Sequence, residues 1–260
     1  VDEPQNQICM RFVFCKSEDI FQAALHAEQA KNGDLIFLDC TEGYAHGLLT
    51  QKTAMSLQAF LRPDDPCLNR DLFMKVDDDT FVNGHKFRSM MNTAWRQHGD
   101  AIFAGLPCDV GVPIRDASSR WYEPESLWPH DYPATMYGGP GYVIGRSLVK
   151  SIISAGVAKK YMLWNEDRAV GVWIGQLQNQ GIEVNWVNLP GTNGFRWDPQ
   201  HTSGQWAQYP FALHHHLDPV TISCLSDLDK ANNPMKYVDV CFLGLAMQMN
   251  ITAMQTNMTQ

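Results

Sequence analysis

Three features are absent from this sequence, and each absence excludes a class of protein. No apolar run approaches the ~20 residues that a membrane-spanning helix needs. Basic residues are not in excess, since the net charge is −8, and this argues against a nucleic-acid partner, which would favour a basic face. None of the seven cysteines stands in a Cys-x-x-Cys pair, so no zinc or dithiol motif of that kind is present.

The sequence also lacks an initiator methionine and a signal peptide. It begins at Val1-Asp2-Glu3-Pro4, so we expect a fragment of a longer protein whose membrane anchor lies outside this segment. Two Asn-x-Thr sequons, at Asn250 and Asn257, fit a protein of a secretory compartment. The odd number of cysteines predicts at least one thiol without an intrachain disulfide.

The residues that are present indicate a folded α/β domain. Hydrophobic residues make up 45% of the chain and aromatic residues 11%, as in globular proteins with an ample core. Strand-like and helix-like patterns alternate, which favours a mainly parallel sheet flanked by helices. We expect strands at 8–14, 35–38, 72–76, 101–106, 142–144 and 183–187, and helices between 17 and 33 and at 50–61, 86–95, 147–155 and 166–180. The segments 107–140 and 191–209 are irregular and aromatic, and such segments usually carry function.

The most informative motif is the acidic run Asp77-Asp78-Asp79, directly after the apolar strand Leu72–Val76. Like charges this close repel one another, and a divalent cation readily neutralises them. The ends of strands in an open α/β sheet are also where such sheets bind ligands. The run therefore predicts a metal site, and the alternative is an acidic turn without a ligand.

Two further segments carry side chains that could act with these acids. The pair Glu166-Asp167 begins a predicted helix, where acids either complement the helix dipole or serve as a general base. His214, His215 and His216 follow one another; in an extended segment His214 and His216 would face one side and His215 the other. At most one or two of them would then enter a single site. Imidazole together with carboxylate suits Mn²⁺ and similar divalent ions.

The segment Tyr137–Ile144 is glycine-rich and precedes a predicted strand. It is not the dinucleotide-binding fingerprint, in which the glycines follow a strand. Gly138, Gly139 and Gly141 either let the backbone approach a bulky ligand or form a tight turn.

Taken in order, these blocks resemble the inverting β-1,3-glycosyltransferases of the galactosyltransferase/Fringe type, glycosyltransferase family 31. The matching blocks are Gly33–Asp39 with Tyr44 and Lys52-Thr53, Cys67 before Phe73–Asn83, Arg120–Tyr122, Tyr132-Pro133, Tyr137–Val143, and Glu166-Asp167 before Val170-Gly171. The last block, His215 with Pro219 and Cys224-Leu225-Ser226, resembles the plant-like branch, although Ser226 stands where that branch has Trp. Arg168 stands where Val is usual, and the family's N-terminal Arg/Thr-Trp block is missing.

The resemblance implies a single domain of GT-A type, with a Rossmann-like, mostly parallel sheet flanked by helices. It implies a catalytic domain at 1–230, with a nucleotide-binding half at about 8–106 and an acceptor-binding half at about 107–230, followed by a C-terminal tail at 231–260. The implied reaction moves a hexose or N-acetylhexosamine, above all galactose, from a UDP-sugar to an acceptor hydroxyl. The product is a β-1,3 linkage on a glycan or glycoprotein.

The resemblance also implies roles for individual residues. Asp79, Asp77 and His215 would hold Mn²⁺ or another divalent cation, Asp78 would lie beside them, and Asp167 would be the general base, with Glu166 as the second choice. Further donor contacts would come from Asp39, Lys52, Gly139 and Gly141, and sugar or acceptor contacts from Trp121, Tyr122 and Tyr137. The implied location is the lumen of the Golgi or another secretory compartment, as the soluble part of a type II membrane protein.

Two other functions remain open. A metal-dependent hydrolase could use the same acids and histidines, and it would usually need a second metal. A non-catalytic carbohydrate-binding relative is the other alternative. It is favoured by Arg168, because a cation beside Asp167 would weaken that carboxylate as a base.

Overall fold

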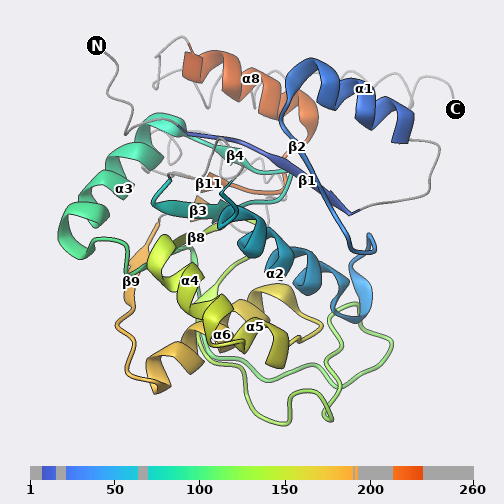
Figure 1. Ribbon diagram of the computed structural model, residues 1–260, viewed down its shortest axis with the longest axis vertical. Coiled ribbons are helices and arrows are strands. Elements are labelled where there is room, and N and C mark those ends of the chain that lie inside the picture. The colour runs from blue at the N-terminus through green and yellow to red at the C-terminus, as the bar shows by residue number, and fades with distance from the viewer. Residues whose placement is uncertain (1–7, 16–21, 64–69, 190, 193–212, 231–260) are drawn as a thin grey trace, which may run out of the picture.

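The computed structural model describes residues 8–15, 22–63, 70–189, 191–192 and 213–230, and Figure 1 shows their arrangement. The central sheet has four strands in the order β3-β8-β5-β9. These strands are β3 (Leu72–Lys75), β8 (Tyr142–Gly145), β5 (Ile102–Gly105) and β9 (Asn185–Asn188). β8 is antiparallel to both of its neighbours, whereas β5 and β9 are parallel.

Within the described ranges, three small sheets accompany the central one. β1 (Phe12–Cys15) and β2 (Leu35–Leu38) pair in parallel, and β6 (Pro107–Cys108) and β7 (Thr135–Met136) pair antiparallel. β11 (Leu213–His214) lies between β10 (Gly191–Thr192) and β4 (Phe81–Val82), parallel to the former and antiparallel to the latter.

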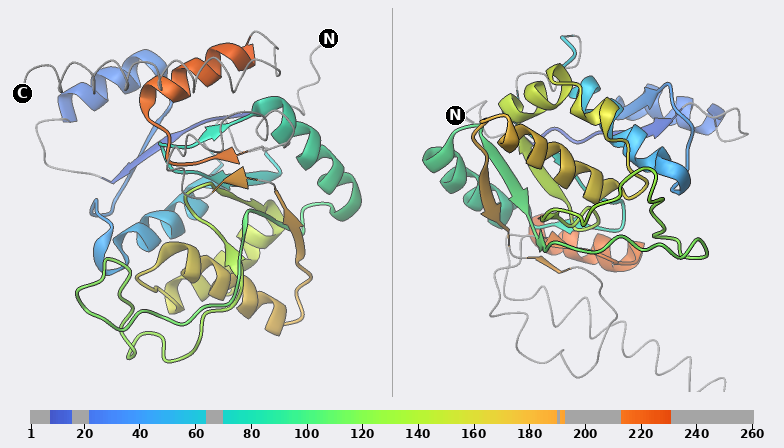
Figure 2. Two further views of the ribbon diagram at one scale, coloured as in Figure 1. Left: turned by 180° about the vertical axis from the view of Figure 1, so that it is seen from behind. Right: turned by 90° about the horizontal axis from the view of Figure 1, so that it is seen from below.

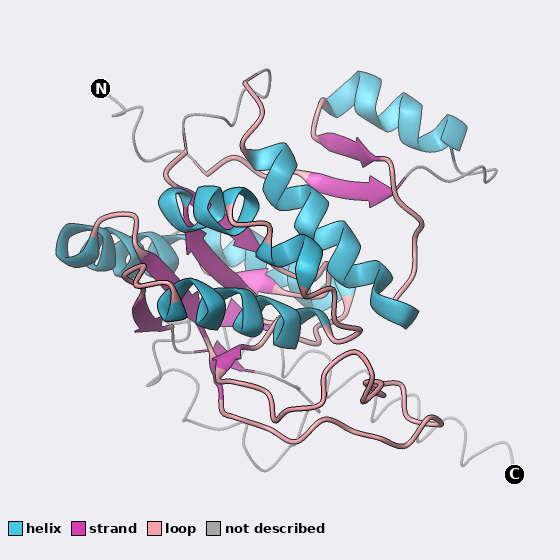
Figure 3. Cartoon of the chain, turned by 60° about the horizontal axis from the view of Figure 1, so that its bottom comes forward, coloured by secondary structure: helices cyan, strands magenta, loops and turns pink. Residues whose placement is uncertain are grey.

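The domain is therefore α/β with mixed sheets, and the expectation of a mostly parallel sheet is wrong for the described residues. The difference arises at β8. A strand parallel to β5 would need a crossover connection, usually a helix. The chain instead leaves β5, runs out through β6 and returns through β7, so β8 enters antiparallel to β5. The irregular segment between β6 and β7 projects from the body of the domain (Figures 2 and 3).

Helices cover the central sheet on both faces. α2 (Leu48–Phe60), α4 (Arg146–Ser154), α5 (Val157–Lys160) and α6 (Glu166–Asn179) pack together in one layer, and α3 (Gly84–His98) lies apart from them (Figures 1 and 2). The remaining helical elements are α1 (Gln22–Asn32), the 3₁₀ turn η2 (Ala45–Gly47) and α8 (Pro219–Lys230). None of the helices in the described part is long and apolar enough to cross a membrane.

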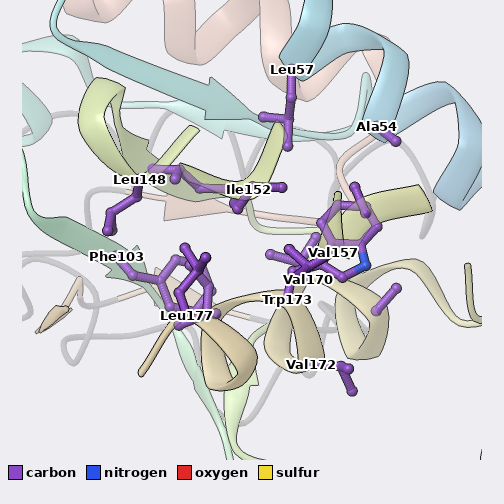
Figure 4. Close-up of a cluster of buried hydrophobic side chains, with 14 of the residues drawn as sticks. Ala54, Leu57, Phe103, Leu148, Ile152, Val157, Val170, Val172, Trp173 and Leu177 are labelled. Carbon is purple, nitrogen blue, oxygen red and sulfur yellow. The ribbon is translucent and has the colours of Figure 1, made fainter. Parts of the chain in front are cut away.

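The alternation of side chains along β5 divides the core into two clusters. Phe103 faces α4 and α6, where it joins Trp173 and Leu177 in the larger cluster (Figure 4). Ile102 and Ala104 point to the other face and pack with residues of α3. Successive strand residues face opposite sides, so the short apolar strand β5 contributes side chains to both clusters.

Most of the predicted elements are confirmed to within a few residues. The structure adds elements that were not predicted, namely the short η2, β4, β6, β7, α5, β10 and β11 and the longer helix α8. The predicted helix start at Ser17, most of the segment 191–209, the tail 231–260 and both sequons lie outside the described residues. Cys15 and Cys40 form a disulfide, and Cys108 is a buried free thiol, as the odd cysteine count requires.

Candidate active site

The acidic run forms a turn between β3 and β4. Because β8 pairs antiparallel with β3, the glycine segment before β8 lies beside the acids that follow β3. The Asp77 amide donates to the Gly139 carbonyl over 3.3 Å, and the Thr80 hydroxyl donates to the same carbonyl over 2.9 Å. Asp77 and Asp79 are half-buried in this turn, and Asp78 is exposed.

The histidine run reaches the same place because β11 pairs with β4 just after the acidic turn. His215 is buried, and its Nε2 lies 3.1 Å from Asp79 Oδ1 and 3.6 Å from Asp77 Oδ2. His216 Nδ1 lies 3.1 Å from Asp79 Oδ2. The Leu217 amide donates to the Asp79 carbonyl over 3.0 Å, which ties the two segments together through the backbone.

The expectation that His215 and His216 face opposite sides is wrong. His216 has a φ of 62°, in the left-handed region, so the backbone turns between the two residues instead of staying extended. The two imidazoles stack with their centroids 3.8 Å apart, and both reach Asp79. His216 is thus a site residue that strand alternation could not predict.

Asp79, His215 and His216 together fit a divalent cation. Their ligand atoms all lie within 4.8 Å of one another, and the set combines imidazole with carboxylate. Asp79 Oδ1 is buried and accepts no hydrogen bond from the described residues, although His215 Nε2 is only 3.1 Å away. A buried acceptor without a partner is costly, and a cation between these atoms would satisfy it.

Asp77 is engaged differently. Its Oδ1 accepts a hydrogen bond from the Lys75 ammonium over 2.5 Å, which leaves Oδ2 on the side of His215. Burial alone would raise the pKa of Asp77, but the neighbouring His215 and Lys75 side chains outweigh burial and lower it. Asp77 therefore holds its charge at the edge of the cluster.

Lys75 connects the acidic turn to the acid pair of α6. Its ammonium lies 3.7 Å from Glu166 Oε2 and donates to the Gly138 carbonyl over 3.0 Å. Burial would lower the pKa of Lys75, but the charges of Glu166 and Asp77 raise it, so the ammonium stays protonated. Lys75 received no role in the sequence analysis, although its place two residues before Asp77 was a usable signal.

The two acids of α6 differ in their surroundings. Glu166 is buried, and its Oε1 accepts hydrogen bonds from Thr53 over 3.1 Å and from Tyr142 over 2.5 Å. Burial raises its pKa. Asp167 is half-buried, and among the residues that the structure describes its Oδ1 accepts only from the adjacent Arg168 amide, over 2.8 Å. Asp167 is therefore the acid with more capacity left for a ligand.

The Arg168 guanidinium is directed into the segment between β6 and β7. It donates to the Asp109 carbonyl over 2.7 Å and lies over the Tyr132 ring at 5.2 Å. Among the described residues Arg168 forms no ion pair with the Asp167 carboxylate. Its guanidinium instead anchors the segment between β6 and β7.

Gly138 and Gly139 allow the close approach of these groups. A Cβ on Gly138 would lie 2.7 Å from Glu166 Oε2, and one on Gly139 would lie 2.1 Å from His215 Cε1. Gly141 has a φ of 108°, which also favours glycine. The glycine segment thus passes between the histidines and the acid pair with no room for a side chain at those two positions.

The other predicted contact residues have different neighbours. Trp121 is 54% exposed under the Arg120 guanidinium, Tyr122 meets Trp164 edge to face, and Tyr137 is half-buried beside the Cys108 thiol. Lys52 in α2 pairs with Glu42 over 3.0 Å, and Asp39 is exposed after β2. The structure thus places Lys52 with Glu42 rather than with the acidic turn.

Comparison of the sequence with known proteins identifies the family of the chain. The sequence model of the galactosyltransferase family matches residues 2–184. The chain belongs to the galactosyltransferase family. The matched residues include the acidic turn, the glycine segment and the acid pair, whereas His215 and His216 lie beyond them.

Individual relatives agree with this assignment. The chain is 30% identical over 210 residues to "Probable beta-1,3-galactosyltransferase 4" of Arabidopsis thaliana, covering 76% of this chain and 47% of the relative. It is 32% identical over 119 residues to beta-1,3-galactosyltransferase GALT1 of the same plant, covering 44% of this chain and 18% of the relative. It is 26% identical over 182 residues to mouse beta-1,3-galactosyltransferase 1, covering 68% and 54%. The chain therefore spans about half or less of the length of these relatives.

Proposed function

We propose that this galactosyltransferase-family chain is the catalytic part of an inverting glycosyltransferase with a GT-A fold. It would transfer galactose, or another hexose or N-acetylhexosamine, from a UDP-sugar to a hydroxyl of a glycan or glycoprotein, forming a β-1,3 linkage. The observation that carries the proposal is that Lys75 joins the acidic turn to the acid pair, 2.5 Å from Asp77 and 3.7 Å from Glu166. This contact supports a single site in which the candidate metal ligands and the candidate base act together.

Asp79, His215 and His216 would hold Mn²⁺ or another divalent cation, with Asp77 beside them. When bound, the cation would supply Lewis-acid neutralisation of the departing nucleoside diphosphate, an effect worth several kcal/mol. Asp78 is exposed at a pocket lined also by Asp79, Leu217 and residues of α8, and so borders the space beside the cluster.

Asp167 would take the proton from the acceptor hydroxyl as that oxygen attacks the anomeric carbon. A base needs a carboxylate with free acceptor capacity near the acceptor, and Asp167 has more of it than the enclosed Glu166. Direct attack from the face opposite the leaving group inverts the configuration, so an α-linked donor yields a β-linked product. Glu166 would hold Lys75 and Tyr142 in place behind the base.

The disulfide between Cys15 and Cys40 supports a location in an oxidising compartment. We therefore propose that the chain acts in the lumen of the Golgi or another secretory compartment, as part of a longer type II membrane protein.

The proposal is tested by assaying UDP-sugars for transfer with and without Mn²⁺, and by titrating UDP calorimetrically. Asp167→Asn should lower transfer at least about 100-fold while leaving UDP binding in Mn²⁺ intact, because it removes only the base. Asp79→Asn should remove metal-dependent UDP binding. Glu183→Gln changes a carboxylate outside the site and serves as the control.

The outcome also separates the alternatives. Metal-dependent UDP binding without transfer to any acceptor would indicate a non-catalytic relative. Release of free sugar whatever acceptor is offered would indicate a hydrolase. Full transfer by the Asp167→Asn variant would exclude Asp167 as the base.

A further inference from the structure

The side chain of Glu123 is fully buried, with 0% of the residue exposed, at a point where the segment between β6 and β7 meets α6. Its carboxyl group accepts four hydrogen bonds. Oε1 accepts from the Trp164 amide over 3.0 Å, and Oε2 accepts from the Asn165 amide over 3.2 Å, from Asn165 Nδ2 over 3.0 Å and from the Tyr132 hydroxyl over 2.9 Å. In the described structure no Lys or Arg side chain forms an ion pair with it.

Three of these four donors belong to Trp164 and Asn165, the two residues just before Glu166-Asp167. A helix usually satisfies its first amides with the side chain of its own N-cap residue. Asn165 stands at the N-cap of α6 but makes no such bond. Its side-chain amide points instead to Glu123 Oε2, to the Tyr132 hydroxyl over 3.1 Å and to the Trp121 carbonyl over 3.3 Å. The start of α6 is therefore fixed by Glu123 from outside the helix.

Glu123 is itself held firmly. Its amide donates to the Ile114 carbonyl over 2.9 Å, and the Arg115 guanidinium donates to its carbonyl over 2.7 Å and to the Trp128 carbonyl over 2.6 Å. The buried Glu123 side chain thus connects the segment between β6 and β7 to the start of α6. Trp121 and Tyr122 lie on that same segment, directly before Glu123.

We propose that Glu123 is a positioning residue that sets the place of the Asp167 carboxylate relative to an acceptor lying on the Trp121–Tyr122 segment. This inference rests on the proposed function. Misplacement of a reacting group by about 1 Å can cost about 100-fold in rate, so anchoring at this point matters for catalysis. In the described part of the chain Glu123 makes no hydrogen bond to the candidate metal ligands Asp79 and His215, so we expect donor binding to depend on it far less than transfer does.

The test compares Glu123→Gln with the wild type and with Glu125→Gln, which changes an exposed carboxylate two residues along. Gln keeps the shape of Glu123, but it replaces one acceptor oxygen by an NH₂ that faces donors. We expect the kcat for transfer to fall about 10- to 100-fold, with UDP affinity in Mn²⁺ unchanged within about 2-fold. Glu125→Gln should match the wild type. Equal losses of kcat and UDP affinity that follow a fall in Tm would show a merely structural role and overturn the proposal.

Hydrogen–deuterium exchange gives a readout that needs no activity. In Glu123→Gln the amides of Trp164 and Asn165 should exchange at least about 10-fold faster than in the wild type, whereas Glu125→Gln should leave them unchanged. Unchanged exchange in Glu123→Gln would overturn the proposal even if the wild type transferred no sugar. Absence of transfer by the wild type, with faster exchange in the variant, would count against the proposed reaction and leave the anchoring by Glu123 supported.

Discussion

At the scale of single residues, Gly139 leaves no room for a side chain beside the buried histidine. Its Cβ would lie 2.1 Å from His215 Cε1, so Gly139→Ala must displace either the glycine segment or the buried imidazole. We expect Mn²⁺ affinity to fall at least about 10-fold, as measured by calorimetry, because a ligand moved out of place loses its contribution to the site.

The matched control for this change is Gly175→Ala in α6, where nothing lies within 4 Å of the added Cβ. That variant should bind Mn²⁺ like the wild type and gain about 0.5–1 kcal/mol in free energy of unfolding, because alanine favours a helix interior over glycine. Normal metal binding by Gly139→Ala would show that His215 is not needed in its present place.

Glu166 gives a pH-dependent prediction. Burial raises its pKa above the ordinary value of 4.5, so the folded protein holds this proton more tightly than the unfolded chain. The contribution of this group to stability is therefore full below about pH 4.5 and is lost as the pH rises through the folded pKa. In urea unfolding, the free energy of the wild type minus that of Glu166→Gln should fall as the pH rises from 4 to 7. A difference that stays constant from pH 4 to 7 would contradict a raised pKa of Glu166 in the folded protein.

At the scale of elements, the sequence predicted those helices and strands whose apolar periodicity is long enough to read. β4, β6, β7 and β11 have two residues each and form only because the folded chain brings partners beside them, so no local pattern marks them. β8 was predicted as a strand, but its direction depends on the path of the segment 107–141. α8 did carry a local signal, Asp218 followed by Pro219, that could have been recognised.

The same contrast holds for the candidate site. The acids Asp77–Asp79 and Glu166-Asp167 stand out because each group follows or begins a regular element. Lys75 lies close to the acids in the sequence, but its contact with Glu166 forms only when α6 packs near β3. His216 could not be assigned from strand alternation, since a single left-handed residue reverses the face that its side chain takes. Glu123 acts through residues more than 40 positions away, beyond the reach of any local pattern.

The beginning of α8 gives an element-scale prediction. Asp218 Oδ1 accepts from the amides of Val220 over 2.9 Å and Thr221 over 3.0 Å, and Oδ2 accepts from the Thr221 hydroxyl over 2.6 Å. Asp218→Ala removes this cap and should lower the free energy of unfolding by about 1 kcal/mol at pH 7. Ser223→Ala, at an exposed position within α8, should change it by less than about 0.5 kcal/mol.

The cap should also depend on pH. The Thr221 hydroxyl and the neighbouring amides lower the pKa of Asp218 below its ordinary value of 3.8, even though burial acts in the opposite direction. Its contribution is therefore present above about pH 3.8 and is lost as the pH falls through the lowered pKa. The wild type and Asp218→Ala should accordingly approach equal stability in acid. An equal difference at pH 7 and at pH 2 would mean that the cap does not involve the ionised carboxylate.

At the scale of the whole molecule, the site joins parts of the chain that are far apart in sequence. The acidic turn belongs to the central sheet, and the histidines follow β11, which pairs with β4. A cation held by Asp79, His215 and His216 would link these parts directly. Because a ligand that binds only the folded state stabilises it by mass action, Mn²⁺ with UDP at about 100 times their Kd should add about 2.7 kcal/mol and raise the Tm.

We also expect the stabilisation by Mn²⁺ and UDP to be concentrated in one segment of the chain. Hydrogen exchange of residues 213–225 should slow most when Mn²⁺ and UDP are added, since this segment meets the central sheet through the histidine–aspartate contacts and the Leu217 amide bond to Asp79. His215→Ala should abolish both the rise in Tm and the local slowing, while His26→Ala, in α1, should retain both. Slowing that is spread evenly over the domain, or that persists in His215→Ala, would mean that the cation binds elsewhere. His215 and His216 would then have no role as metal ligands.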